Sequence, residues 1–247
     1  MLVLGWPGLR VDAYSKHNLR RENCSSCGGI MDMGWFQLIL MKTEVIRAEH
    51  PIALNHAVDT LKHGGLVAFP TDTVYGLASL PFQAEYVERL YIAKGRNSER
   101  AIALLLGDLE QLEQVVDNIG ETAMIWARKF WPGPLTLILP RLDSLPDVLS
   151  PTSTIGVRVP DHPVALALLN MVGPLAVTSA NLSGYQNANT AQDVFDQLNG
   201  RIHLILDGGR APGGVPSTVV DCTADDPIVL REGPISLRDL MGVLPGK

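Results

Sequence analysis

The segment YIAKGRNSER, residues 91–100, places Lys94 and Arg96 on either side of Gly95, with Arg100 close behind. The segment follows a predicted helix. A glycine with neighbouring cations often ends a helix, because glycine suits the cap and cations suit the helix dipole. The same cations could instead bind an anion such as phosphate. Taken alone, the segment favours a helix C-terminus, because such ends are common.

Three further polar clusters come after predicted strands. They are FPTDTVYGLAS (69–79), VTSANLSG (177–184) and DGGRAPGGVPSTVVD (207–221). Each by itself is typical of a hydrogen-bonded turn, and the third exposes backbone N–H groups in the manner of an anion-binding nest. Open α/β sheets build their ligand sites at strand ends. The four clusters together therefore predict a crevice for a phosphate-bearing ligand and a small polar one.

Other common chemistries lack the residues that they need. The six histidines show no H-E-x-x-H spacing, and no Ser-His-Asp or Cys-His set is evident. Cys24 and Cys27 form a single C-x-x-C pair, for which His17 is a poor complement as a zinc ligand. Cys222 lies in a predicted strand and is expected to be a core residue. The sequence therefore predicts no metal site made by the protein alone.

Composition bounds the class of protein. The chain has 247 residues, of which 46% are hydrophobic and 19% charged, with a formal net charge of -6. This charge argues against a protein that coats nucleic acid, which needs a basic field, although a local basic cleft remains open. No run of 18 apolar residues occurs, so no membrane span is predicted.

Residues 1–40 differ from the rest of the chain, because they show no sustained helical or strand period. They carry four Lys/Arg and three Asp/Glu, a net of +1, so residues 41–247 carry -7. The segment is poor in serine and contains acidic residues, unlike a transit peptide, and its apolar start is too broken for a good signal peptide. We interpret it as a dispensable extension or a start codon assigned too early, with regular structure beginning after Met41.

From Met41 onward, helical and strand patterns alternate, which predicts one α/β domain with a mixed sheet. The predicted helices are 50–63, 83–94, 108–116, 120–130, 162–171 and one that Thr190 caps, with Asp193 three residues on in a capping-box position. Ile52 is expected on the buried face of the first helix, with Ala53, Ala57, Val58 and Leu61. The predicted strands are 66–69, 101–106, 135–139, 154–159, 175–178, 202–206, 218–221 and 228–231.

Residues from about Glu44 to Leu240 resemble the threonylcarbamoyl-AMP synthase family, which has the YrdC-like fold. The resemblance rests on FPTDTVYGL, AKGR, FWPGPLTLIL, TIGVRVPDHP, TSANLSG and PSTVVD followed by VLREG, in family order. It implies an α/β (α+β) fold over residues 41–247, with a twisted mixed sheet flanked by helices and a central concave ligand cleft. It also implies the short, single-domain form of the family.

The resemblance implies synthesis of threonylcarbamoyl-AMP and pyrophosphate from L-threonine, bicarbonate and ATP, for N6-threonylcarbamoyladenosine modification of tRNA. Lys94 and Arg96 would be catalytic, and Mg²⁺ would be held mainly through ATP phosphates. The implied ATP-binding residues are Lys94, Arg96, Arg100, Thr154, Ser179, Asn181 and Arg231. The implied threonine-binding residues are Thr73, Tyr75, Arg158, Thr178 and Ser217. A cytoplasmic location, possible RNA or tRNA contact and a downstream tRNA threonylcarbamoyl transferase complex are also implied.

The chain departs from the family pattern at a few positions. Leu105 falls where many members have a histidine near the threonine, and Ala101 replaces a usual proline. T-S-A-N replaces the frequent P-S-A-N at residues 178–181. An RNA-binding module of the same fold, without synthase activity, is the alternative function. Carbamoyl transfer to a hydrogenase maturation partner is a third, although the additional domains of those larger proteins are not seen in this sequence.

Overall fold

The computed structural model describes residues 42–95, 101–224 and 226–245. The expectations for residues 1–40, Arg96 and Arg100 lie outside these ranges.

The described strands form one mixed sheet of ten strands, in the order β1-β8-β2-β3-β7-β4-β6-β5-β9-β10. Four neighbouring pairs are parallel, namely β1 with β8, β2 with β8, β4 with β6 and β5 with β9, and the others are antiparallel. The predicted mixed sheet is therefore confirmed. The strands are β1 (Glu44–Arg47), β2 (Val67–Phe69), β3 (Gly76–Ser79), β4 (Ala103–Leu105), β5 (Leu135–Pro140), β6 (Thr154–Arg158), β7 (Leu175–Ser179), β8 (Leu204–Asp207), β9 (Thr218–Asp221) and β10 (Ile228–Arg231).

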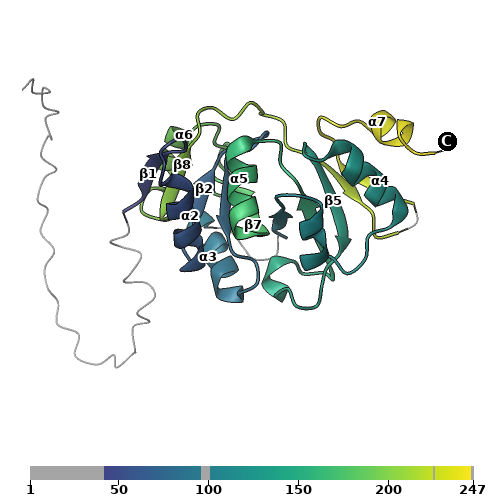
Figure 1. Ribbon diagram of the computed structural model, residues 1–247, viewed down its shortest axis with the longest axis horizontal. Helices are drawn as coiled ribbons and strands as arrows, with labels where there is room; N and C mark the ends of the chain where they lie inside the picture. The colour runs from purple at the N-terminus through teal and green to yellow at the C-terminus, as the bar shows by residue number, and fades with distance from the viewer. Residues whose placement is uncertain (1–41, 96–100, 225, 246–247) are drawn as a thin grey trace, which may run out of the picture. The chain divides into compact units, whose positions relative to one another are not determined.

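Helices flank the sheet, as expected for an α/β domain. They are α2 (Ala53–Lys62), α3 (Ala84–Lys94), α4 (Glu121–Phe130), α5 (Pro163–Val172), α6 (Ala191–Leu198) and α7 (Leu237–Gly242), with 3-10 helices η2 (Glu110–Gln114) and η3 (Asp147–Leu149). Figure 1 shows α2 and α3 at one end of the sheet and α4 at the other. Across the described ranges, no helix is both long and apolar enough to cross a membrane.

Local sequence signals account for several helix ends. Gly95 ends α3 with a left-handed φ of 58°, and its N–H bonds to the carbonyls of Ile92 and Tyr91, as a glycine cap does. Thr190 and Asp193 form the expected capping box at the start of α6. The predicted cap of the YIAKGRNSER segment and the predicted start of α6 are thus both confirmed.

The two faces of the sheet carry different helices. Leu61 of α2 and Leu168 of α5 pack on one face, in a cluster with Phe69 of β2 and Val177 of β7. Helices α3, α4 and α6 contribute to a second cluster. Helix α7 is held near α4 because Trp126 Nε1 donates to the Leu240 carbonyl at 2.8 Å. These contacts make the sheet a rigid support for the side chains on its open parts.

The structure corrects some sequence predictions. Within the predicted helix 108–116, only Glu110–Gln114 form a helix, the short 3-10 helix η2. Asp108 Oδ1 accepts from the Gln111 N–H, and the Gln111 side-chain amide bonds to the Gly107 N–H and the Leu169 carbonyl. Ile52 was expected on the buried face of α2, but it precedes the first helical turn and is exposed. Strands β1 and β3 and helix α7 were not predicted. Strand β3 lies within residues 69–79, which were interpreted as a polar cluster typical of a hydrogen-bonded turn.

Candidate active site

A cavity of about 410 Å³ lies on the open part of one sheet face. Successive side chains of a strand point to opposite faces, and alternate residues of the central strands line this cavity. They are Ala103 and Leu105 of β4, Gly156 and Arg158 of β6, Thr136 and Ile138 of β5, Val177 and Ser179 of β7, with Ser217 and Val219 at β9. Val177 and Leu105 also belong to the cluster under α2 and α5. The cavity therefore opens where the helix cover of this face ends.

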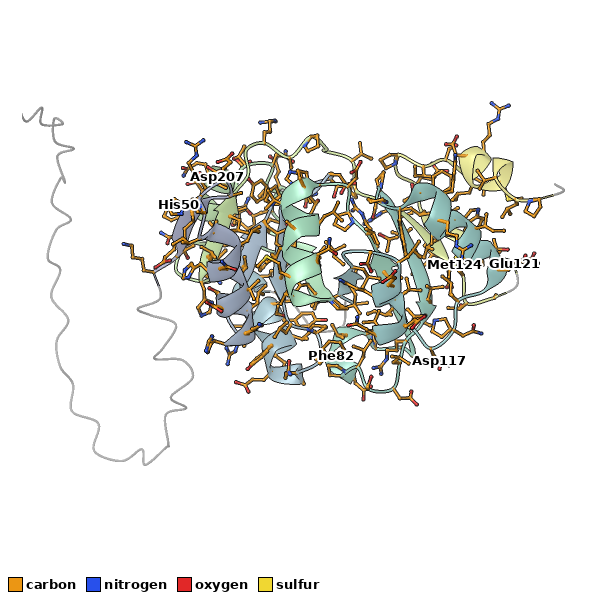
Figure 2. The ribbon with its side chains drawn as sticks, in the orientation of Figure 1. His50, Phe82, Asp117, Glu121, Met124 and Asp207 are labelled. Atoms are coloured by element: carbon orange, nitrogen blue, oxygen red, sulfur yellow. The ribbon has the colours of Figure 1, made fainter. Side chains whose placement is uncertain are left out.

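Arginines on two strands give the cavity a positive character. Arg158 ends β6 and Arg231 ends β10, and both line the cavity, whereas no carboxylate among the described residues does. Figure 2 shows the acidic side chains of Asp207 near one end of the fold, Glu121 near the other and Asp117 along the lower edge. Two guanidinium groups in the cavity wall suit an anionic ligand, in a chain whose formal net charge is -6.

Arg158 is buried and makes three side-chain hydrogen bonds at its corner of the cavity. It forms an ion pair with Asp72 Oδ1, donates through Nε to the Gly133 carbonyl at 2.9 Å and donates through an η nitrogen to Thr73 Oγ1 at 3.2 Å. Burial lowers the pKa of Arg158, Asp72 acts in the opposite direction, and Arg231 adds to the lowering. The other carboxylate oxygen of Asp72 is buried and has no hydrogen-bond partner within the described part of the chain. We call Thr71, Asp72, Thr73 and Arg158 the Arg158 corner.

Arg231, at the end of β10, also lines the cavity and is more exposed than Arg158. It donates to the carbonyl of Ser217 at 3.0 Å and to Ser217 Oγ at 3.1 Å, and Ser217 Oγ lies 2.8 Å from Thr136 Oγ1. Desolvation by burial lowers the pKa of Arg231. No ion pair to this guanidinium is found among the residues that the structure describes. We call Thr136, Ser217 and Arg231 the Arg231 corner.

The glycine-rich loop between β8 and β9 packs directly on Thr73. A Cβ on Gly213 would lie 2.2 Å from the Thr73 carbonyl oxygen, so only glycine fits there without a shift. Tyr75 donates its hydroxyl to the Gly209 carbonyl at 2.6 Å, and burial raises its pKa to about 12. The hydroxyl of Tyr75 therefore anchors the loop, and Tyr75 also lines the cavity.

Lys94 is nearly inaccessible, with 3% of its surface exposed, and it is not among the residues that line the cavity. Its ammonium donates to the carbonyl of Ser179, to the carbonyl of Asn181 at 2.7 Å and to Asn181 Oδ1 at 3.3 Å. It therefore holds the turn that follows β7. The Asn181 amide also donates to the carbonyls of Leu182 and Tyr185, which fixes the same turn from the other side.

The structure brings together most of the residues that the resemblance assigned to ligands. Thr73, Tyr75, Arg158, Thr178, Ser179, Ser217 and Arg231 line one cavity. Lys94 and Asn181 do not line the cavity themselves: Lys94 bonds to the carbonyl of Ser179 and to Asn181, in the turn that follows β7. Thr154, at the start of β6, does not line the cavity; its hydroxyl pairs with Thr152 Oγ1 at 2.8 Å. Arg96 and Arg100 lie outside the described residues.

Sequence reasoning missed Thr71, Thr136 and Asn187, which also line the cavity. Thr136 could have been found from alternation, because it is the polar residue in an otherwise apolar strand. Thr71 lies in the first polar cluster but matched no assigned position. Leu105 lines the cavity as an apolar wall, at the position where the family often has histidine.

The fold is that of a YrdC-like α/β domain, with a cavity on one sheet face that two arginines line. The chain belongs to the Sua5/YciO/YrdC family, because the sequence model of that family, described as "Telomere recombination", matches residues 59–233.

Curated relatives carry one activity name. The chain is 43% identical to the threonylcarbamoyl-AMP synthase of Bacillus subtilis (strain 168), over 77% of this chain and 56% of that protein. It is 40% identical to the enzyme of the same name from Pyrococcus abyssi, over 76% of this chain and 56% of that protein. A putative threonylcarbamoyl-AMP synthase of Mycobacterium tuberculosis is 39% identical, over 76% and 87%. The chain thus spans about half the length of the first two relatives.

Solved structures agree with the fold. A structure of P. abyssi Sua5 complexed with L-threonine aligns with a TM-score of 0.77 at 36% identity, over 83% of this chain and 61% of that one. The structure of Escherichia coli YciO aligns with a TM-score of 0.72 at 29% identity, over 81% of this chain and all of that one. The predicted family and YrdC-like fold are both confirmed.

Proposed function

We propose that this protein is an L-threonylcarbamoyladenylate synthase, which makes threonylcarbamoyl-AMP and pyrophosphate from L-threonine, bicarbonate and ATP. The observation that carries the proposal is the cavity that joins the Arg158 and Arg231 corners across one sheet face. Guanidinium groups bind carboxylates and phosphates, and the hydroxyls between them suit the polar groups of an amino acid. The relatives' names give the reaction class.

Each substrate is assigned to one end of the cavity. Arg158 faces the amino-acid carboxylate, and Thr73 and Thr178 face the other polar groups of threonine. Ser217 lies between the two substrates. Arg231 and Ser179 face the nucleotide, and Lys94 and Asn181 hold the turn that carries Ser179. Arg96, Arg100 and Thr154 remain proposed ATP contacts from the resemblance alone.

The chemistry then needs positioning and charge stabilisation more than a covalent intermediate. The free amine of threonine attacks the carbon of bicarbonate or CO₂ and forms a carbamate anion. The bicarbonate route releases water, and the CO₂ route releases a proton to solvent. A carbamate oxygen attacks the α-phosphorus of ATP, and the bond to pyrophosphate breaks. The cationic residues of the site stabilise the charge that moves to the leaving pyrophosphate.

Magnesium fits this scheme as a companion of the nucleotide. The cavity offers hydroxyls and guanidinium groups, and no cluster of three or more histidine, cysteine or acidic residues that could hold a metal ion was found in the described part of the chain. Phosphate oxygens and water are ordinary Mg²⁺ ligands. The ion would therefore enter on ATP, where it would neutralise phosphate charge.

The direct test is pyrophosphate release from ATP by the purified chain, with L-threonine and bicarbonate each omitted in turn, together with mass detection of threonylcarbamoyl-AMP. We expect release that requires all three substrates. No release under any condition would contradict the proposal. Tight RNA binding that weakens steeply with salt, in the absence of release, would support the RNA-binding module instead.

The wider role is part of the same proposal. The product would pass in the cytoplasm to a tRNA threonylcarbamoyl transferase complex, because threonylcarbamoyl-AMP is an activated mixed anhydride that needs an acceptor. Direct RNA or tRNA contact is tested by the same RNA titration.

A further inference from the structure

The Arg158 corner contains a chain of hydroxyl groups whose proton positions can be derived from their partners. Thr71 Oγ1 lies 2.6 Å from the Val74 carbonyl oxygen and 3.0 Å from Thr73 Oγ1. The backbone N–H groups of Thr73 and Val74 also point at Thr71 Oγ1, at 3.2 and 3.3 Å. Thr71 and Thr73 are both almost fully buried and both line the cavity.

The hydroxyl of Thr71 has one proton. A carbonyl can only accept, so the short contact to Val74 takes that proton. The contact between the two threonines, at 3.0 Å, then takes the proton of Thr73, and the longer N–H contacts of Thr73 and Val74 share the second lone pair of Thr71. Arg158 can only donate, so the oxygen of Thr73 also accepts from the guanidinium, at 3.2 Å. The protons of this chain are therefore directed from Arg158 to Thr73, from Thr73 to Thr71 and from Thr71 to the Val74 carbonyl.

The result is an oxygen with fixed polarity. Thr73 gives its proton to Thr71 and receives one from Arg158, which leaves one lone pair that no described residue uses. A ligand that meets Thr73 must donate to it, because a ligand oxygen with only lone pairs would face the lone pair of Thr73 and be repelled.

The Arg231 corner has no such constraint. Ser217 and Thr136 share one proton across 2.8 Å, and no backbone carbonyl was found to accept from either side-chain hydroxyl in the described residues. One hydroxyl proton of this pair is therefore available to a ligand. This corner can donate to an anion through Arg231 and a hydroxyl.

We propose that Thr71 is a positioning residue that makes Thr73 an obligate acceptor, so that the substrate presents an N–H or O–H donor at the Arg158 corner. Building on the proposed function, the donor is the amine or the side-chain hydroxyl of threonine. The carboxylate lies on Arg158 and not on Thr73. Thr71 acts through Thr73 and needs no contact with the reacting atoms.

The test compares Thr71→Val, which keeps the shape but removes the hydroxyl, with Thr71→Ser, which keeps the hydroxyl. We expect Thr71→Val to raise the KM for threonine about tenfold while the KM for ATP changes less than about threefold. Thr71→Ser should restore most of the loss. Thr60→Val is the matched control, because the Thr60 hydroxyl also donates to a backbone carbonyl, that of His56, at 2.7 Å. Thr60 does not line the cavity. An unchanged threonine KM in a folded Thr71→Val protein, or equal losses in both Thr71 variants, would overturn the proposal.

A second measurement uses wild-type protein and does not depend on the folding of any variant. Competitive inhibition is measured for two analogues that replace a donor by an acceptor: O-methyl-threonine for the hydroxyl, and 3-hydroxy-2-oxobutanoate for the amine. We expect one of them to bind at least about tenfold more weakly than threonine, and the identity of that analogue shows which donor faces Thr73. The discrimination should shrink in Thr71→Val, where the Thr73 proton is free to turn. Equal binding of both analogues and threonine would contradict the assignment.

Failure here can be separated from failure of the proposed function. Calorimetric binding of threonine to the wild type without pyrophosphate release would refute the synthase, and the same variants would then test Thr73 polarity through Kd. No binding of threonine to the wild type would refute both.

Discussion

The Arg158 and Arg231 corners each contain an arginine, but the two guanidinium groups have different surroundings. Arg158 is buried and paired with Asp72, and it donates to the hydroxyl of Thr73, whose own proton is directed to Thr71. Arg231 is exposed at the end of an edge strand, and in the described ranges it bonds only to the carbonyl and hydroxyl of Ser217. A neutralised, oriented arginine favours selectivity for a small zwitterion, while an unpaired one attracts a more highly charged anion. The contrast shows that residue type does not determine the role of an arginine.

The largest expected effect comes from removing each arginine in turn. Arg158→Ala should raise the threonine KM by roughly 100-fold and also destabilise the fold by about 3–5 kcal/mol, because Asp72 is left buried without its partner. Arg231→Ala should raise the ATP KM with little change in unfolding. Steady-state kinetics and thermal melting separate the two. The same substrate dependence in both variants would remove the distinction between the corners.

Lys94→Ala should have a comparable effect on activity, with roughly a 100-fold loss of turnover with ATP. The buried ammonium bonds three oxygens of the turn after β7, so its loss should also lower the Tm by several degrees. Arg96→Ala serves as the comparison, with a raised ATP KM and an unchanged Tm. Full pyrophosphate release by both variants would show that the segment is a helix end and nothing more.

Asp72→Asn should raise the threonine KM by about tenfold and leave the ATP KM unchanged, because it loosens the ion pair at one corner only. Burial lowers the pKa of His162, and the Asp72 charge partly opposes this lowering. The His162 pKa should therefore fall further in the variant, as NMR titration can measure. A change confined to the ATP KM would contradict the placement of Asp72.

The same histidine gives a pH dependence of stability. Its folded-state pKa lies below the unfolded value of about 6.5, so protonation of His162 opposes folding. The free energy of unfolding should decline as the pH falls through the range below about 6.5, and His162→Asn should flatten that decline. Chemical denaturation at several pH values measures it. An equal decline in the variant would assign the dependence to other groups.

Amino-acid selectivity is expected to be modest for a methyl group and larger for a hydroxyl. Serine, which lacks one methyl, should be used roughly tenfold less well than threonine. Valine should be rejected more strongly, because a polar group of the site is left unpaired. Leu105→His adds a polar wall and should widen the gap between threonine and valine. Equal pyrophosphate release with all three amino acids would refute the threonine site.

The smallest expected effect is that of removing residues 1–40. The segment shows no sustained helical or strand period, and the sequence pattern that the family shares begins after Met41. A chain beginning at Met41 should match the full chain in Tm and turnover. A loss of several degrees together with lost activity would show that the segment contributes to the domain.

Much of the fold could be predicted from the sequence because its signals are local. Apolar runs marked the strands 218–221 and 228–231, which form at those bounds, and Thr190 with Asp193 marked the start of α6. Strand β3 was missed because it has only four residues and all of them are buried. It therefore lacks the alternation of apolar and polar residues that identifies a strand. Residues 108–116 were predicted as a longer helix because bonds from the Gln111 side chain to distant groups leave no local signature.

The sequence by itself determined the family, the mixed α/β fold and the set of polar residues available to a ligand, because these depend on motifs and short-range patterns. Only the tertiary structure decided which of them share a cavity and how each is oriented. Arg158 and Asp72 are 86 residues apart in the chain, as Lys94 and Ser179 are 85 apart. Burial and hydrogen-bond direction arise from such distant pairs, so the polarity of Thr73 and the anchoring role of Lys94 emerge only when the strands assemble.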